Sequence, residues 1–247
     1  MTLDPRIARL IQRGALFVCD HSGGKDSQAM YLKLSKIIPA NQLIVIHAEL
    51  PGVEWEGSVE FIKSTIGDTP LLIAQATKTF IEMVERRGMF PSPSTRQCTS
   101  DLKRDPINRE LRHYLKAHPE FGGLIVNCMG MRAQESPGRA KQKDFRVNER
   151  ESKAGREWYD WLPIHEVLET EVFAAIADAG QEPFWTYGAG MKRKSCCFCI
   201  MACESDLTLA AKLQPAMYAE LVALEKRIGF TMSMSRKPLE QITGIAA

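Results

Sequence analysis

The sequence predicts an α/β fold, a mostly parallel twisted sheet with helices on both faces, followed by a smaller C-terminal helical part that contains cysteines. Short apolar runs alternate with helix-like segments, and runs of this kind indicate strands that are buried on both faces. A glycine turn joins the first strand to the first helix. Because ligands of such sheets bind beyond the carboxyl ends of the strands, we expect the site there.

The elements follow in a regular order. The expected strands are Ala15–Cys19, Leu43–His47, Leu71–Ile73 and Leu124–Cys128, and the helices that separate them are Ser27–Ile38, Val53–Ile66, Thr79–Arg87 and Asp105–His118.

After Arg139 the pattern changes. Lys141–Arg156 is polar and is expected to form a mobile loop, and helices are expected at Glu169–Ala179 and Leu207–Ile228, with a weakly structured tail after Ser233. The sequence thus favours three consecutive parts: an α/β domain over 1–140, a mobile basic loop over 141–160, and a helical part with the cysteine cluster over 161–247.

Composition is that of a globular protein. The 247 residues are 45% hydrophobic and 25% charged, and no apolar run approaches the roughly 18–20 residues that cross a bilayer. The first residues lack the apolar core of a secretion signal, so we expect a cytoplasmic protein with no membrane partner. In that compartment the seven cysteines are expected to be thiols or metal ligands rather than disulfides.

Charge is unevenly distributed. The net charge is only +2, but the segment from Arg86 to Arg156 contains 16 Lys and Arg against 8 Asp and Glu. Such an excess suits nucleotide phosphates or a nucleic-acid backbone. A solvated basic loop explains Lys141–Arg156 equally well.

The segment Ser22–Ser27, with the sequence SGGKDS, carries the most specific signal. Its two glycines allow a phosphate to approach the backbone, and the N–H groups that begin the following helix point at that phosphate. Lys25 adds a positive charge, and Ser22 and Ser27 add hydroxyl groups. The spacing differs from that of the phosphate loop of phosphoryl-transfer NTPases.

This segment resembles the loop of the PP-loop ATP pyrophosphatase superfamily, whose members bind ATP and break its α–β phosphate bond. The resemblance implies that Ser22, Gly23, Gly24, Lys25 and Ser27 bind the phosphates, and that Asp26 holds Mg²⁺ or caps the helix. In such a fold the end of the second strand contacts adenine or ribose, which makes His47 and Glu49 candidates. A histidine satisfied at the rim of the fold is an equal alternative for His47.

Two further segments resemble the phosphoadenosine phosphosulfate reductase branch of that superfamily. The first, Ser94–Lys103, has the Arg-x-Cys-Thr-x-x-Leu-Lys pattern, so Arg96 and Lys103 are candidates for neutralising phosphates. Cys98 is a candidate metal ligand or sulfur-handling thiol, and its basic neighbours are expected to favour the thiolate. Surface charges around a buried thiol are the alternative.

The second, Gly130–Arg139, has the Gly-x-Arg-x-x-Glu-Ser-x-x-Arg pattern directly after an apolar strand. Gly130 permits close approach, Arg132 and Arg139 are expected to hold anionic oxygens, and Glu135 is expected to orient an arginine. The resemblance therefore covers roughly residues 15 to 140.

Three cysteines, Cys196, Cys199 and Cys203, lie within eight residues of one another. Thiolates of this kind suit an iron–sulfur cluster or zinc, with Cys98 as the expected fourth ligand and Cys197 as its competitor. The family resemblance favours a [4Fe–4S] cluster over zinc. On a helix these positions share one face, so a core role is the alternative.

The pyrophosphatase loop is intact, whereas assimilatory phosphosulfate reductases typically carry a degenerate one and end in a tail with a nucleophilic cysteine. This chain has no cysteine after Cys203. The sequence therefore favours an ATP-dependent adenylating enzyme, with Lys25, Asp26 and Arg132 as its catalytic residues, that activates an acceptor for sulfur transfer. Its expected cofactors are ATP, Mg²⁺ and the cluster, and its expected partners are a nucleotide substrate, a nucleic-acid acceptor and a sulfur-donor protein. A phosphosulfate reductase-like oxidoreductase, and a nucleic-acid or nucleotide-binding module with a structural metal site, are the alternatives.

Overall fold

A six-stranded sheet organises the fold. The computed structural model describes residues Leu3–Ala247, and its strands lie in the order β3-β2-β1-β4-β6-β5. The pairs β1–β2, β1–β4 and β4–β6 are parallel, and β5 pairs antiparallel with β6 at the edge. The strands are β1 (Leu16–Asp20), β2 (Leu43–Glu49), β3 (Leu71–Gln75), β4 (Leu124–Met129), β5 (Phe145–Val147) and β6 (Glu157–Trp161). The predicted α/β class with a mostly parallel sheet is confirmed.

Helices connect these strands, as the sequence pattern predicts. They are α1 (Pro5–Gln12), α2 (Lys25–Ile37), α3 (Ser58–Ile66), α4 (Phe80–Arg87), α5 (Gln97–Thr99), α6 (Asp105–Ala117), α7 (Pro137–Ala140), α8 (Glu169–Asp178), α9 (Trp185–Gly188), α10 (Glu204–Leu213), α11 (Pro215–Ile228) and α12 (Leu239–Thr243). Short turns of other helix types are η1 (Ala40–Gln42), η2 (Ser100–Arg104), η3 (Pro119–Phe121) and η4 (Ala133–Glu135).

The chain packs into two compact units, which interleave along the sequence. The first unit comprises the chain up to His47 together with Val59–Ile73 and Ile107–Pro183. The second comprises Ala48–Ser58, Ala74–Pro106 and Phe184–Ala247. The sequence favoured consecutive parts instead, because composition changes along the chain do not reveal which segments pack together.

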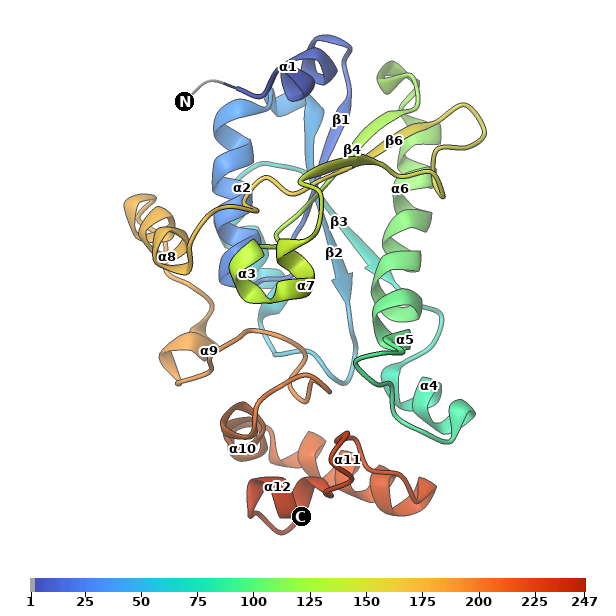
Figure 1. Cartoon of the computed structure of the whole chain (residues 1–247), viewed down its shortest axis with the longest axis vertical. Helices are drawn as coiled ribbons and strands as arrows, with labels where there is room; N and C mark the ends of the chain where they lie inside the picture. Colours follow the sequence, from blue (N-terminus) through green and yellow to red (C-terminus); the bar gives the residue numbers. More distant parts are fainter. Residues whose placement is uncertain (1–2) are drawn as a thin grey trace. The chain divides into compact units, whose positions relative to one another are not determined.

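The first unit is built around β1 and β4, which are almost wholly buried. Figure 1 shows α2 and α6 on opposite sides of these strands. One face of the sheet contributes Phe17, Cys19, Val126 and Cys128 to a core that α1 and α2 cover with Ile7, Leu10, Met30 and Leu34. Strands buried on both faces explain why the sequence pattern there is continuously apolar.

The expected mobile loop contains secondary structure. Its residues include β5, and β6 begins directly after Arg156. On these two strands Arg146 donates two hydrogen bonds to Asp160, at 3.1 and 3.0 Å. β5 has only three residues, and in β6 charged and aromatic residues do not alternate regularly, so periodicity does not reveal either strand.

The second unit ends in three helices rather than one helix and a tail. Pro215 interrupts the expected long helix, which separates α10 from α11. The buried Glu225 carboxylate then accepts from the backbone N–H groups of Met232 (2.7 Å) and Leu239 (2.8 Å). These bonds order the segment that leads into α12, so the expectation of a weakly structured tail is wrong over α12.

Among residues 3–247, none of the helices combines the length and the apolar character that a transmembrane span requires.

Candidate functional site

The phosphate-loop segment lies at the junction of β1 and α2, as predicted. Gly23 has φ 75°, a left-handed conformation that favours glycine, and Gly24 is the N-cap of α2. The Ser27 hydroxyl donates to the Gly24 carbonyl at 2.9 Å and accepts from the Ser22 N–H at 3.2 Å. The loop is therefore held in shape by its own hydrogen bonds and presents the N-terminus of a 13-residue helix.

Two buried histidines, His21 and His47, support this loop through hydrogen bonds. His21 is 1% exposed, and its Nδ1 accepts from the Gly23 N–H at 3.1 Å. His47, on β2, is also buried, and its Nδ1 donates to the His21 carbonyl at 2.8 Å. This contact gives His47 a structural role in the loop, and its nucleotide contact stays a prediction. His21 was not singled out from the sequence, although it immediately precedes the motif.

A buried ionic cluster lies at the start of α2. Lys25 is 4% exposed and Arg132 is 3% exposed. The Asp26 carboxylate joins them, with Oδ2 at 3.1 Å from Lys25 Nζ and Oδ1 accepting from Arg132 Nε at 2.6 Å. The first and third sequence motifs, which are more than a hundred residues apart, are thus brought together in the first unit.

Gly130 explains how β4 and α2 approach so closely. A Cβ at this position would lie 3.2 Å from the carbonyl carbon and oxygen of Asp26 and from Ser27 Cα. Beyond it, Glu135 accepts from the Arg132 N–H at 2.9 Å and pairs with Arg139. Glu135 thus contacts both arginines of the motif.

Helix α8 adds residues that no motif indicated. Ala29 of α2 packs against Val172 and Ile176 of α8. This packing places Glu169 Oε1 at 3.1 Å from Lys25 Nζ and at 3.9 Å from Arg132 Nη2. Phe173 lies on the same helix, and Lys25 Nζ is 5.9 Å from the centre of its ring. The sequence predicts an amphipathic helix here, but nothing in it indicates that the first turn of this helix contacts the phosphate loop.

A second polar group lies within the sheet, at the end of β1. Asn127 of β4 donates from Nδ2 to Asp20 Oδ2 at 3.3 Å. Burial raises the pKa of Asp20 to about 7, and the negative charge of Asp160 acts in the same direction. The oxygens Asp20 Oδ1 and Asn127 Oδ1 are buried and accept no hydrogen bond from residues 3–247.

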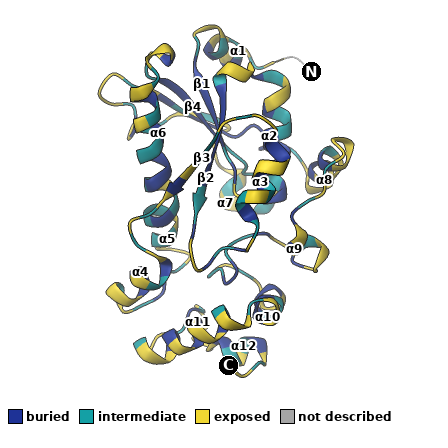
Figure 2. Cartoon of the chain, turned by 180° about the vertical axis from the view of Figure 1, so that it is seen from behind, coloured by how far each residue is buried: buried dark blue, intermediate teal, exposed yellow. Residues whose placement is uncertain are grey.

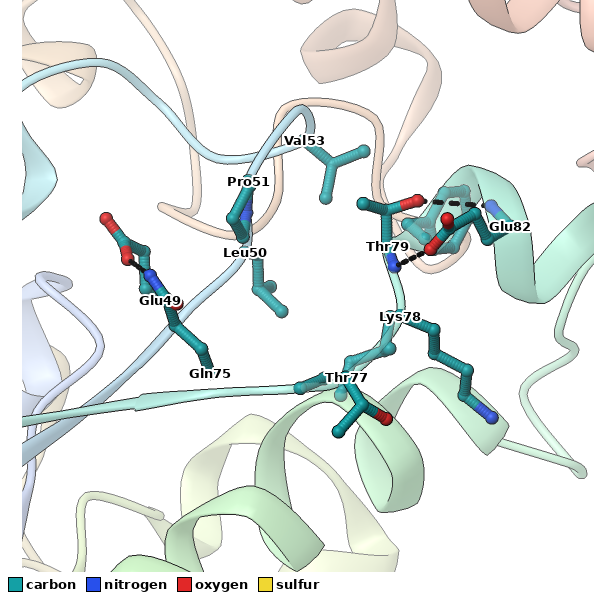
Figure 3. Close-up of a pocket in the computed structure, with 12 residues that line it drawn as sticks. Glu49, Leu50, Pro51, Val53, Gln75, Thr77, Lys78, Thr79 and Glu82 are labelled. Carbon is teal, nitrogen blue, oxygen red and sulfur yellow. Dashed lines mark hydrogen bonds between the residues drawn. The ribbon is translucent and has the colours of Figure 1, made fainter.

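The second unit contains a small pocket at the ends of β2 and β3. Its volume is about 110 Å³, and Glu49 lies in its wall (Figure 3). The Gln75 amide donates to the Glu49 carboxylate, and the Thr79 hydroxyl and the Glu82 carboxylate form the capping box that begins α4. The remaining wall is Leu50, Pro51, Val53, Ala76, Thr77, Lys78, Phe80 and Leu102.

Lys103 lies among three of the predicted metal ligands. Its Nζ donates to Cys196 Sγ at 3.5 Å. The electrostatic interaction with Cys196 raises the pKa of Lys103, and Cys199 and Cys98 act in the same direction. Burial raises the pKa of Cys98, an effect larger than the opposing one of Lys103. Lys103 thus lowers the pKa of Cys98 in the expected direction, but burial outweighs it and the pKa lies above its usual value.

The four sulfurs do not form a metal site in this structure. In the described part of the chain, no group of three His, Cys, Asp or Glu side chains is arranged to hold a metal ion. The amine of Lys103 donates to Cys196 Sγ, and Cys203 is exposed, with its Sγ 3.1 Å from the Ser205 hydroxyl. The iron–sulfur cluster and the zinc ion stay predictions. The three cysteines also do not share a helix, because α10 begins only after Cys203.

Over 149 residues, the chain is 29% identical to an uncharacterized 37.8 kDa protein in the gpa 5' region of Escherichia phage 186. This match covers 60% of the chain and 43% of the phage protein, so the aligned part is less than half of that relative.

Two solved structures are similar to this chain. The crystal structure of phosphoadenylyl-sulfate reductase from Candida auris, in a phosphate complex, aligns with a TM-score of 0.50 at 12% identity and covers 79% of this chain and 97% of that one. FMN adenylyltransferase from Candida glabrata aligns with a TM-score of 0.47 at 13% identity, over 74% of this chain and 53% of that one. Residues 17–202 match the phosphoadenosine phosphosulfate reductase domain, and the chain therefore belongs to that family.

Proposed function

We propose that the protein is an ATP-dependent adenylating enzyme that activates an acceptor for replacement of oxygen by sulfur. The observation that carries this proposal is the complete phosphate loop at the start of α2, with Lys25 and Arg132 buried beside it. A preformed loop and two buried cations suit the developing charge of a departing pyrophosphate. Membership of a family of nucleotide-using enzymes supports the same reading.

In the proposed reaction an acceptor oxygen attacks the α-phosphorus of ATP. A new P–O bond forms, the bond to the bridging α–β oxygen breaks, and pyrophosphate leaves with that electron pair. The loop N–H groups and the hydroxyls of Ser22 and Ser27 bind its oxygens, while Lys25 and Arg132 neutralise their charge. Mg²⁺, when bound through Asp26, would supply further charge neutralisation. Arg139 is proposed to hold an additional anionic oxygen.

The sulfur-transfer half of the proposal rests on the second unit. There Lys103 donates to Cys196 and interacts electrostatically with Cys98 and Cys199, and exposed Cys203 follows in sequence. We assign sulfur handling to these thiols. Glu49, Arg96 and Lys103 are proposed as nucleotide contacts, and a nucleic acid is the proposed acceptor.

Pyrophosphate release from ATP in the presence of candidate acceptors tests the first half. Replacing Lys25→Ala removes one of the two buried cations, so we expect the rate to fall by about 10²–10³-fold. Lys36→Ala is the matched control, because Lys36 is exposed at the other end of the same helix. Equal rates for both variants, or no pyrophosphate release by the unaltered protein, would contradict the proposal.

Family membership favours one alternative, reduction of phosphoadenosine phosphosulfate. That activity would release sulfite with thioredoxin as reductant. We prefer adenylation because the phosphate loop Ser22–Ser27 is complete at the start of α2. Sulfite release from the sulfonucleotide, together with inertness toward ATP, would reverse the preference.

A further inference from the structure

The carboxylate of Glu169 lies where the proposed function requires a phosphate. It is 3.1 Å from Lys25 Nζ and 3.9 Å from Arg132 Nη2, the two buried cations beside the loop. The Asp26 carboxylate contacts the same two side chains. The two carboxylates formally balance these two cations, which weakens the attraction of the two cations for an anion.

The backbone of Glu169 is fixed, whereas its side chain has room to move. The Glu169 N–H donates to Gln134 Oε1 at 2.9 Å, and the same oxygen accepts from Arg132 Nη1 at 2.7 Å. Gln134 thus ties the first residue of α8 to the segment that carries Arg132. The Glu169 side chain itself is 50% exposed, whereas those of Lys25 and Arg132 are 5% and 3% exposed. The carboxylate can therefore turn into solvent while both cations stay in place.

Asp26 and Glu169 are not equivalent. Asp26 Oδ1 accepts from Arg132 Nε at 2.6 Å, and the Asp26 side chain is only 18% exposed. Glu169 is as close to Lys25 as Asp26 is, but it is farther from Arg132 and more exposed, so its removal from the cluster costs less. An arriving phosphate would accordingly displace Glu169 first.

We propose that Glu169 is an internal competitor for the anion site and sets its phosphate affinity: its carboxylate occupies the place between Lys25 and Arg132 that a nucleotide phosphate takes on binding. This inference rests on the proposed function, because it assumes that Lys25 and Arg132 bind phosphate.

The test is calorimetric titration of the full chain with inorganic pyrophosphate, with a chelator present and again with Mg²⁺. Glu169→Gln removes the competing charge and keeps the shape of the side chain, so we expect the Kd to fall by about three- to tenfold, as follows from ion pairs of roughly 1 kcal/mol. Glu169→Ala should also lower the Kd, and it replaces the glutamine variant if that variant does not fold. Asp178→Asn is the matched control, since it makes the same charge change at the exposed opposite end of α8 and should leave the Kd unchanged.

The outcomes separate the two proposals. An unchanged or weaker affinity in both Glu169 variants, while the unaltered protein binds pyrophosphate, overturns the role of Glu169 alone. Weakening confined to the titration with Mg²⁺ makes Glu169 a metal ligand and also overturns it. Failure of every form to bind pyrophosphate overturns the anion site itself, and the role of Glu169 with it.

Discussion

At the scale of single residues, Asp20 in the first unit is a carboxylate whose pKa is strongly raised. It ends β1, one residue before the histidine that supports the phosphate loop, and its carboxylate has Asn127 as a donor and Asp160 as a negative neighbour. Burial of a carboxylate disfavours its charged form, so Asp20 holds its proton to about pH 7 in the folded state. Its ordinary pKa is 3.8, and this difference links folding to pH.

We therefore expect Asp20 to make the protein less stable as pH rises from about 4 to about 7. The folded state binds the proton more tightly, so the stabilisation is complete below the unfolded pKa and is lost as pH passes the folded pKa of about 7. A shift of this size corresponds to at most about 4 kcal/mol. Asp20→Asn should flatten this part of the profile and raise the melting temperature at pH 8, as measured by calorimetric unfolding.

Asp68→Asn is the control for this experiment, because Asp68 is exposed in the same unit. An identical pH profile for Asp20→Asn and the unaltered protein would show that Asp20 does not hold its proton.

At the scale of elements, the contact between the end of β4 and the start of α2 decides the site. The sequence predicts both elements and indicates that Gly130 permits a close approach. It does not predict that Gly130 lies against the backbone of Asp26. That approach brings Arg132 to Asp26 and Lys25. A buried cluster assembled from two motifs is thus a product of how a strand and a helix pack.

Gly130→Ala tests this contact. The added methyl group would lie 3.2 Å from backbone atoms of Asp26 and Ser27, which are unable to move aside as a flexible side chain would. We expect a loss of about 1–3 kcal/mol in the free energy of unfolding, measured by urea denaturation, and weaker pyrophosphate binding.

Gly138→Ala is the matched control, since a Cβ there meets nothing within 4 Å. If both alanine variants unfold at the same urea concentration, the close approach at Gly130 does not affect the free energy of unfolding.

At the scale of the whole molecule, the cysteines report on folding. Cys19, Cys128 and Cys197 are buried, Cys98, Cys196 and Cys199 are intermediate, and Cys203 is exposed. Burial raises the pKa of Cys197 to about 12 and that of Cys19 and Cys128 well above the usual value. A thiol that is both covered and protonated reacts slowly.

We expect the exposed thiol of Cys203 to react first with a disulfide reagent in the native protein, and the three buried thiols to react only on unfolding. Time-resolved labelling followed by peptide mass spectrometry measures the order, and a denaturant releases all seven thiols for comparison. Cys203→Ser should remove the fastest phase. Rapid labelling of Cys19 or Cys128 in native protein would contradict the buried placement of β1 and β4.

The sequence by itself determined the strand–helix alternation, the phosphate loop and the family, because these depend on local apolar patterns and on motifs that are continuous in the chain. It missed β5 and β6, whose charged residues give no alternation, and it missed His21, Gln134 and Glu169, which belong to no motif. Only the tertiary structure decided that Lys25, Asp26, Arg132 and Glu169 form one ionic cluster, and that Lys103 lies among three thiols. Such contacts join residues that are far apart in the chain. Packing alone decides which side chains meet and how strongly burial shifts their pKa values.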